Sequence, residues 1–488
     1  MGAPAPAGAA QSVARGTCDT VRLDLDTDAP TPRVRGRSPS LAALLSFLWP
    51  GLGQLYTGKR RLAALFAVPA LLVLVLLAYE LRQGPVVFLA RFADPAFSRA
   101  AAVVVVLLGS WQLAAVVHAF VSGERRRTRR ILDTVVLAAL AVVLVIGYAG
   151  TGMLLALTSD AESHVFNPDS SLIDLTTPSP NPSSSALPGP TATPVQTPSI
   201  DSRVTILFTG VDAATSRTES LYDSIMVVSY DPKTDSVQMV SVPRDSASFP
   251  MYFGNHPVVP VTTRINSVPT YVKNGWIQSP DSPYMTLVKE VSYLVGIPID
   301  YYAVMDLDGF VKMIDAVGGI DVVNPSVIDD PVYATPAGQI IGFHLAAGPQ
   351  HLDGDQALAY VRSRHGADNS DWARSSRQQQ VLVALLHEMA QPSELLALPG
   401  LISTLGSSVT TNFPAGQVAD YVAIGQNVPS QNFTDVVLGP PYTILNVNTT
   451  SAASTTCLLN YKVAALSIQL FGKDSTWYGK PAPANTCP

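Results

Sequence analysis

The sequence contains little charge for its length. Charged residues make up only 14% of its 488 residues, and its mean hydropathy is +0.25. Soluble domains usually reach about 25% charged residues. The composition therefore excludes a wholly soluble protein and a mostly disordered one, although 39 prolines indicate at least one disordered stretch. The length is typical of about three domains.

Cysteine is also scarce, with only Cys18, Cys457 and Cys487. No Cys-x-x-Cys pair occurs, so neither a thioredoxin-like redox motif nor a cysteine zinc site is indicated. Cys457 and Cys487 lie in the same C-terminal region. If that region is outside the cell, a disulfide between them is one outcome, and two unpaired thiols are the other.

The net charge of −6 hides an uneven distribution. The chain is net basic up to residue 200 and net acidic beyond it. An acidic domain does not favour nucleic acid as a partner, because binding to the phosphate backbone requires a basic face. The basic part contains the long apolar runs.

Three apolar runs are long enough to cross a bilayer, which takes about 20 residues. They are Leu62–Leu81, Ala100–Val121 and Ile131–Leu157. A fourth stretch, Leu41–Tyr56, is shorter and is interrupted by Pro50-Gly51-Leu52-Gly53. It is either a full span or a re-entrant hairpin, because Pro and Gly interrupt helices. Residues 41–157 are therefore predicted to form a multi-pass membrane region of three spans and a hairpin, or of four spans.

Basic clusters orient these spans. They are the arginines at 33, 35 and 37, the run Lys59–Arg61, and the arginine-rich stretch Glu124–Arg130. The positive-inside rule makes all three cytoplasmic. Residues 1–40 are then a cytoplasmic tail, and everything after residue 158 is extracytoplasmic. Three spans and a hairpin satisfy this orientation, whereas four spans place the basic N-terminus outside.

One stretch of this region matches the start of a phosphate-binding P-loop. It runs from Gly53 to Lys59, but the next residue is Arg60, where Ser or Thr is needed to bind magnesium. No strand pattern precedes it. We interpret it as a membrane turn followed by cytoplasmic anchors.

Residues 158–200 are rich in Pro, Ser and Thr. Such a segment cannot bury enough apolar surface to offset its ordering entropy. It is predicted to be an extended spacer that holds the following domain away from the membrane.

Beyond residue 200, short β-rich runs such as Val204–Val211 and Ser224–Tyr230 alternate with helical ones such as Tyr284–Val295. This alternation predicts an α/β domain over residues 201–440, with a mixed central sheet and helices on both faces, preceded by the all-α transmembrane region. Residues 441–488 form a C-terminal extension with a helix predicted at Asn460–Phe471.

Acidic and basic residues follow the first strands of this domain. Asp212 ends one strand and Asp223 begins the next, and two carboxylates one loop apart suit a hard cation such as magnesium. The alternative is a pair of turn and capping aspartates. Arg244 follows a third strand, and Pro243 fixes the direction in which the chain leaves it. The alternative for Arg244 is a surface ion pair.

Further along, Arg362 and Arg364 project from one face if their stretch is extended. Paired guanidiniums of this kind fit phosphate geometry. The alternative for the whole basic cluster that follows is a solvated charged face.

The next helix is predicted to begin with Asp371 as its N-cap. Arg374, Arg377 and Gln378 then share one face near the positive end of the helix dipole, where anions are favoured. Four arginines this close together in an acidic domain indicate a polyanionic small group, most simply a pyrophosphate with a magnesium ion.

The order of motifs closely resembles the LytR–CpsA–Psr family over roughly residues 203–391. The motifs that carry the resemblance are GVD, DSIM, SVPRD, RIN, IDYYAVMDLDGF, IDAVGGIDV, ALAYVRSR and DWARSSRQ. The resemblance implies a membrane-anchored phosphotransferase. Such an enzyme moves a glycopolymer from a polyprenyl-pyrophosphate carrier to peptidoglycan and forms a phosphodiester.

The resemblance also implies residue roles. Asp212 and Asp223 would hold magnesium, with manganese as the alternative ion. Asp371 would be the base for the acceptor hydroxyl. The pyrophosphate would lie among a set of basic and amide side chains, namely Arg244, Arg362, Arg364, Arg374 and Gln378, with Arg377 as a supporting charge. The lipid tail would enter an apolar groove.

One position departs from the family pattern. The family usually has Arg-Ser-Asp where this chain has Leu221-Tyr222-Asp223, so one phosphate-facing arginine is missing. Arg217 in the same loop is the candidate to replace the missing arginine. Two other functions therefore stay open: a hydrolase of the same polyprenyl-pyrophosphate lipids, and a non-catalytic regulator that binds lipid phosphates. Abundant Ala, Pro and Val are typical of GC-rich bacteria, which makes actinobacterial polymers candidate substrates.

Overall fold

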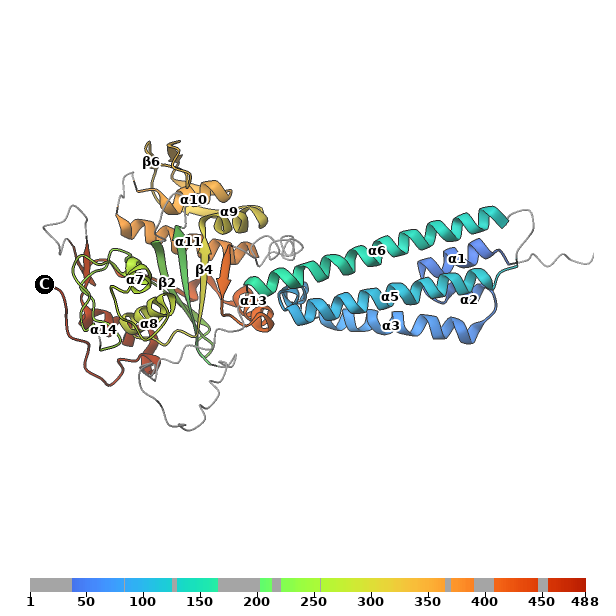
Figure 1. Cartoon of the computed structure of the whole chain (residues 1–488), viewed down its shortest axis with the longest axis horizontal. Helices are drawn as coiled ribbons and strands as arrows, with labels where there is room; N and C mark the ends of the chain where they lie inside the picture. Colours follow the sequence, from blue (N-terminus) through green and yellow to red (C-terminus); the bar gives the residue numbers. More distant parts are fainter. Residues whose placement is uncertain are drawn as a thin grey trace, which may run out of the picture.

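The computed structural model describes most of the membrane region and of the outer domain (Figure 1). The described residues are 37–82, 84–124, 130–165, 202–212, 221–254, 256–364, 370–389, 408–445 and 455–488. Outside them lie most of the predicted linker, Arg33, Arg35, Arg217 and the four arginines at 125, 126, 127 and 129.

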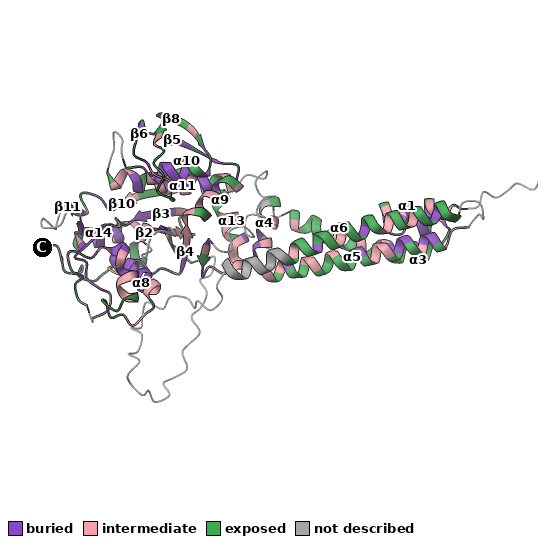
Figure 2. Ribbon diagram, turned by 45° about the horizontal axis from the view of Figure 1, so that its top comes forward, coloured by how far each residue is buried: buried purple, intermediate pink, exposed green. Residues whose placement is uncertain are grey.

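The membrane region is a bundle of helices. Its long members are α3 (Arg60–Leu81), α5 (Pro95–Val121) and α6 (Arg130–Val165), and these three are long and apolar enough to cross a membrane. In the most apolar part of each of these helices, at most 22% of the residues are buried. Figure 2 accordingly shows exposed residues along the outside of the bundle. An apolar outer surface of this extent is unfavourable in water and favourable in lipid.

The stretch around Pro50 forms a helical hairpin of α1 (Pro39–Leu48) and α2 (Leu52–Tyr56) packed against α5. Gly53 N donates to Ser46 Oγ at 3.1 Å, and a Cβ at Gly53 would lie 2.0 Å from Ala42 O. Buried Gln54 donates to Ala115 O at 2.7 Å. The segment that resembles a P-loop is therefore a packed turn of the bundle.

The described basic anchors lie at one end of the bundle. Lys59 Nζ donates to Ser122 Oγ at 2.8 Å, and Glu124 N donates to Arg37 O at 2.9 Å. The other end carries α4 (Pro85–Ala90) and η1 (Arg91–Ala93), and α4 lies beside α13 (Val418–Asn427) of the outer domain (Figure 2). A topology of three spans and a hairpin requires the basic anchors and the outer domain to lie at opposite ends of the bundle.

The outer domain is built on a six-stranded sheet in the order β10-β3-β2-β1-β4-β9. The strands are β1 (Val204–Asp212), β2 (Leu221–Asp231), β3 (Ser236–Ser241), β4 (Tyr301–Asp306), β9 (Val409–Thr411) and β10 (Phe433–Val437). β1 pairs in parallel with β4 and antiparallel with β2, so the predicted mixed sheet is confirmed.

Helices cover both faces of this sheet, as predicted (Figure 2). One face packs on α7 (Val268–Lys273), α8 (Pro283–Val295) and α14 (Asn460–Phe471), and the other lies under α9 (Leu307–Ala316), α11 (Asp371–Met389) and α13 (Val418–Asn427). The helix α10 (Gly354–Arg362) packs on α9 and α11. Successive side chains of a strand point to opposite faces of the sheet. Ile225 and Val227 enter the core beneath α8, whereas Met226 faces Leu382 of α11.

Three two-stranded ribbons complete the domain. They pair β5 (Ile320–Asn324) with β8 (Gly348–Leu352), β6 (Ile328–Asp330) with β7 (Phe343–Leu345), and β11 (Thr443–Leu445) with β12 (Thr456–Leu458). Short 3-10 helices lie at Ile265–Ser267 (η3), Ala415–Gln417 (η5), Ser430–Asn432 (η6) and Gly472–Asp474 (η7). The predicted C-terminal helix is confirmed as α14.

The outer domain also contacts the membrane region directly. Val87 and Ala90 of α4 pack against Ala419 and Ala423 of α13 in a small apolar cluster. The domain is therefore joined to the membrane helices by packing as well as by the intervening chain.

Candidate active site

The two predicted metal carboxylates lie at the ends of neighbouring strands. Gly210 pairs with Ser224 and Val211 with Tyr222, so Asp223 is the extra residue of a β-bulge. A bulge interrupts strand alternation and re-aims a side chain, and bulges are common beside active sites. Asp212, which is 3% exposed, and Asp223 therefore line the same cavity although they come from different strands.

Arg244 enters the cavity from the chain that follows β3. Its Nη1 donates to Asp223 Oδ1 at 2.6 Å, and its Nε lies 3.7 Å from Asp245 Oδ2. Asp245 also lies 3.1 Å from Arg264 Nη1. These ion pairs aim Arg244 as the sequence predicts, but its side chain is largely buried and is not part of a surface ion pair.

The segment containing Arg362 differs from the expectation. The stretch is not extended, because Arg362 is the last residue of α10 and only Ser363 and Arg364 leave the helix. Ser363 Oγ and Arg364 N both donate to Asp330 Oδ2, at 2.8 and 3.2 Å. This buried carboxylate turns the chain so that both arginines still line the cavity.

The start of α11 corrects the predicted N-cap. Ser370 Oγ accepts from Ala373 N at 3.1 Å, so Ser370 caps the helix and Asp371 occupies its first turn. Asp371 Oδ1 lies 3.0 Å from Arg374 Nη1, with 37% of the Asp371 side chain exposed. Arg374 and Gln378, one turn apart, both line the cavity.

The cavity has a volume of about 410 Å³. Its charged lining consists of five arginines and three aspartates, namely Arg244, Arg264, Arg362, Arg364, Arg374, Asp212, Asp223 and Asp330. Asn266, Tyr333 and Gln378 add polar groups. The excess of positive charge lies in a domain that is acidic as a whole, so the cavity favours an anion.

Several donors in this cavity form no hydrogen bond with the part of the chain that the structure describes. Arg244 Nε, Arg362 Nη1 and Arg374 Nε are buried and have no hydrogen-bond acceptor among the residues that the structure describes. A buried donor without an acceptor costs about 1–3 kcal/mol. Three such groups around one cavity indicate a ligand rich in acceptor oxygens.

The arginines also influence one another. Burial lowers the pKa of Arg374, and the positive charge of Arg244 lowers it further, although Asp371 partly compensates. Burial opposes the charge of Arg244 as well, but Asp223 and Asp245 raise its pKa overall. Burial raises the pKa of Asp245, and its hydrogen bond with Asp371 adds to this, against the effect of Arg244. The site therefore holds repelling like charges in the absence of an anion.

Arg377 lies behind this cavity. Its Nη2 donates to Ser363 O at 2.6 Å, and its guanidinium lies 5.5 Å from the centre of the Tyr360 ring. It lines a second cavity of about 690 Å³, which shares only Arg364 with the first among the described residues. The structure thus places Arg377 where it supports the turn after α10.

The carboxylates are compatible with a magnesium ion. Within the described ranges, no group of three or more His, Cys, Asp or Glu side chains gathers in a metal-binding arrangement. Magnesium does not need such a group, because it commonly takes one or two carboxylates and completes its shell with substrate phosphates and water. Asp212 and Asp223 are the two carboxylates in this cavity that match that donor set.

Sequence reasoning assigned no role to several residues of the cavity, among them Arg264, Asn266, Asp330 and Tyr333. Arg264 and Asn266 belong to the RIN motif, which carried the resemblance without a function attached. Asp330 had no sequence signal, because it acts through the backbone and the hydroxyl of a segment more than 30 residues away.

A family model described as the LytR_cpsA_psr family matches residues 180–458. Among curated proteins, the chain is 34% identical over 208 residues to the polyisoprenyl-teichoic acid–peptidoglycan teichoic acid transferase TagV of Bacillus subtilis (strain 168), covering 42% of this chain and 49% of TagV. It is 31% identical over 217 residues to the corresponding transferase TagU of Bacillus anthracis (strain CDC 684 / NRRL 3495), covering 44% and 63%. The chain thus spans between about half and two thirds of these relatives.

Among solved structures, the chain is similar to the crystal structure of B. subtilis TagV. The identity is 25% and the TM-score 0.44, covering 55% of this chain and 96% of that one. A structure of TagT bound to LIIa-WTA has 21% identity and a TM-score of 0.41, covering 55% and 89%.

Proposed function

The chain belongs to the LytR_cpsA_psr family, and from that premise we propose that it is a membrane-anchored glycopolymer phosphotransferase. Its donor would be a glycopolymer on a polyprenyl-pyrophosphate carrier. Its acceptor would be peptidoglycan, and the new link a phosphodiester. The names of the relatives support a polyisoprenyl-linked donor and a peptidoglycan acceptor.

The observation that carries this proposal is the set of buried arginine N–H groups around the 410 Å³ cavity that have no acceptor among the described residues. A pyrophosphate offers many acceptor oxygens and negative charge in a small volume. Guanidiniums bind phosphate oxygens in bidentate geometry. Phosphoryl transfer is catalysed mainly by positioning and charge stabilisation, which is what such a cavity supplies.

In the proposed reaction, a hydroxyl oxygen of the acceptor sugar attacks the phosphorus that carries the glycopolymer. The bond from that phosphorus to the bridging oxygen breaks, and polyprenyl phosphate leaves with the electron pair. Asp371 accepts the proton of the hydroxyl. Asp371 does not itself line the cavity, but it lies 3.0 Å from Arg374, which does, and 37% of its side chain is exposed. These contacts support the role, because an acceptor can approach Asp371 from solvent.

Magnesium, with manganese as the alternative, would be held by Asp212 and Asp223, and when bound it would neutralise developing charge on the phosphate oxygens. Arg244, which contacts Asp223 at 2.6 Å and lines the cavity, would bind pyrophosphate oxygens beside this carboxylate. Arg362 lies 3.6 Å from Asp212 and is placed in the same way.

We further propose a multi-pass anchor with the outer domain on the extracytoplasmic side. The opposite ends of the bundle support this orientation, since the basic anchors lie at one end and α4 and the outer domain at the other. The anchor keeps the site close to a donor whose lipid tail stays in the bilayer.

The test uses the full chain in lipid nanodiscs with a polyprenyl-pyrophosphate oligosaccharide, uncrosslinked peptidoglycan and magnesium. Mass spectrometry should detect a phosphodiester-linked conjugate that is lost in EDTA and in Asp212→Asn. Asp308→Asn is the matched control, because Asp308 is an exposed carboxylate on α9, away from the cavity lining. It should keep full transfer.

Other products would identify the alternatives. Free phosphosaccharide without conjugate would mean hydrolysis. Tight binding of the donor without turnover would mean a non-catalytic binding role, with Leu221 as the first residue to examine. Transfer that survives both Arg362→Ala and Arg374→Ala would show that the site assignment is wrong.

A further inference from the structure

The segment that carries Arg244 and Asp245 is held on one side by the chain that carries Arg264. Asn266 N donates to Arg244 O at 3.3 Å, and Ile265 N donates to Ser246 O at 2.8 Å. Arg244 and Arg264 therefore come from segments that are hydrogen-bonded to each other through their backbones.

The other side of the same segment is held by the C-terminal extension. Thr456 N donates to Asp245 O at 3.0 Å, and Ala247 N donates to Thr456 O at 2.7 Å. Ser246 and Thr456 form an isolated parallel bridge. Two of the backbone groups that follow Arg244 are thus satisfied by β12, which lies some 210 residues further along the chain.

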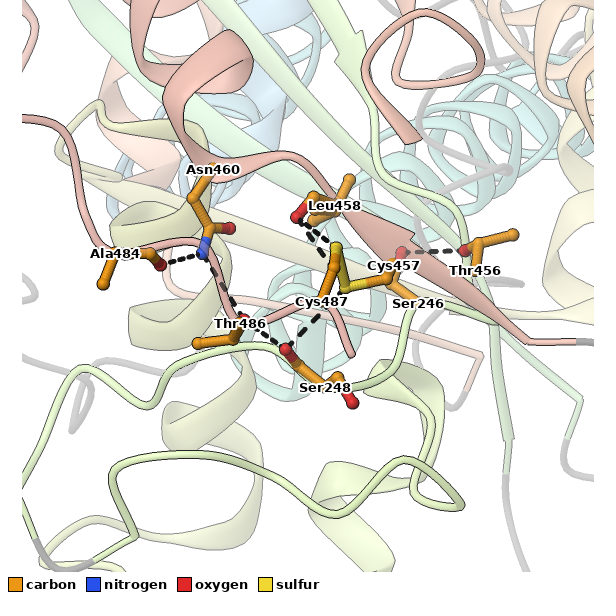
Figure 3. Close-up of a disulfide and its surroundings, with 9 residues drawn as sticks. All are labelled: Ser246, Ser248, Thr456, Cys457, Leu458, Asn460, Ala484, Thr486 and Cys487. Carbon is orange, nitrogen blue, oxygen red and sulfur yellow. Dashed lines mark hydrogen bonds between the residues drawn. A yellow bond between two sulfur atoms is a disulfide. The ribbon is translucent and has the colours of Figure 1, made fainter. Parts of the chain in front are cut away.

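A disulfide fastens β12 to the end of the chain (Figure 3). Cys457 is bonded to Cys487, and the hydroxyl of Thr486 donates to Ser248 O. Ser248 has a φ of 53°, in the left-handed region that residues other than glycine keep only where their surroundings hold them. The tail is itself anchored, since Asn460 Nδ2 donates to Ala484 O at 2.6 Å.

From these contacts we propose that residues 455–488, closed by the Cys457–Cys487 disulfide, are a clamp that positions Arg244 and Asp245 for the donor pyrophosphate. The inference rests on the proposed function and adds positioning residues outside the cavity. We call these residues the C-terminal clamp.

The geometry explains why the clamp affects binding. Asp245 contacts both Arg244 and Arg264, so a shift of its backbone displaces two guanidiniums of the cavity at once. Arg244 in turn contacts Asp223, one of the two proposed metal ligands.

The test measures donor affinity in variants of the clamp. The full chain in nanodiscs is titrated with geranylgeranyl pyrophosphate and magnesium by calorimetry, and transfer is measured for KM and kcat of the donor. Thr486→Val keeps the shape but removes the hydroxyl that holds Ser248. It should raise Kd and KM three- to tenfold with a smaller change in kcat, and Thr486→Ser, which keeps the hydroxyl, should restore both.

The double change Cys457→Ser with Cys487→Ser should raise Kd by at least as much, as should reduction of the wild-type disulfide. If that double variant does not fold, the comparison of Thr486→Val with Thr486→Ser tests the clamp instead. Unchanged Kd and KM in a folded Thr486→Val chain would overturn the clamp, and so would a lower Tm with unchanged Kd. If the wild type binds the probe but does not transfer, the proposed transferase fails, and the same Kd comparison still decides on the clamp.

Discussion

Replacing Arg374 by methionine separates binding from stability in this site. Methionine keeps most of the volume of the side chain but removes the guanidinium. Arg374 is only 5% exposed, and its Nε is buried without an acceptor among the described residues. The residue therefore holds a buried charge that is poorly compensated in the free protein. An anion in the cavity would compensate it.

The magnitudes follow from that environment. A hydrogen bond to a charged group contributes about 1.5–3 kcal/mol, so the variant should bind the donor pyrophosphate about 10- to 150-fold more weakly. Stability should not fall with it. Burial and Arg244 lower the pKa of Arg374, which means that folding disfavours its charge. Its ion pair with Asp371, whose side chain is 37% exposed, contributes only about 1 kcal/mol or less. We expect unchanged or slightly higher stability.

Arg203→Met is the matched control with the opposite expectation. The Arg203 side chain is 10% exposed, against 6% for Arg374, and its guanidinium contacts Asp231 at 2.6 Å and Asp474 at 2.8 Å, away from the cavity. This control should lose stability and keep donor affinity. Calorimetric titration with geranylgeranyl pyrophosphate and thermal unfolding measure the two quantities in both variants. A clear drop in Tm for Arg374→Met with unchanged Kd would show that Arg374 is structural and refute the reasoning.

Three other outcomes follow from the structure. Leu221→Arg adds a cation to the cavity lining opposite Asp212 and should tighten donor binding several-fold by calorimetry; weaker binding would show that the five existing arginines already saturate the anion. Opening the Cys457–Cys487 loop, with a separation of 30 residues, should cost about 3.5 kcal/mol of unfolding free energy in denaturant titrations. Burial raises the pKa of Asp300 from 3.8 to about 6, against the hydrogen bond from Thr205 N. Wild-type stability should therefore decline as pH rises from about 4 to 6, and Asp300→Asn should flatten that decline.

The sheet and its helices could be predicted because local patterns decide them. The strand ending at Asp212 and the helices α8, α11 and α14 follow from the two-residue and 3.6-residue periods of their apolar side chains. The resemblance then placed most of the cavity residues in one site. These features depend on contacts that are close in sequence or on motifs in a recognisable order.

The parts that could not be predicted depend on long-range contacts. The turn after α10 is set by Asp330, so the condition under which the sequence placed Arg362 and Arg364 on one face, an extended stretch, does not hold. The cap of α11 falls on Ser370 instead of Asp371, because two adjacent residues are both good caps and only the backbone geometry selects between them.

The bulge at Asp223 shows why a motif alone does not define this site. In a regular ladder Asp223 would pair within the sheet, and its neighbours Tyr222 and Ser224 would both face the opposite side. The register shift between Gly210 and Val211 takes Asp223 out of the pairing, and its carboxylate meets Arg244 at 2.6 Å. An insertion or deletion of one residue in β2 would reverse that side chain while leaving every motif intact. The distance between the two carboxylates, and with it the capacity to hold a cation beside an arginine-bound pyrophosphate, is therefore a property of strand register.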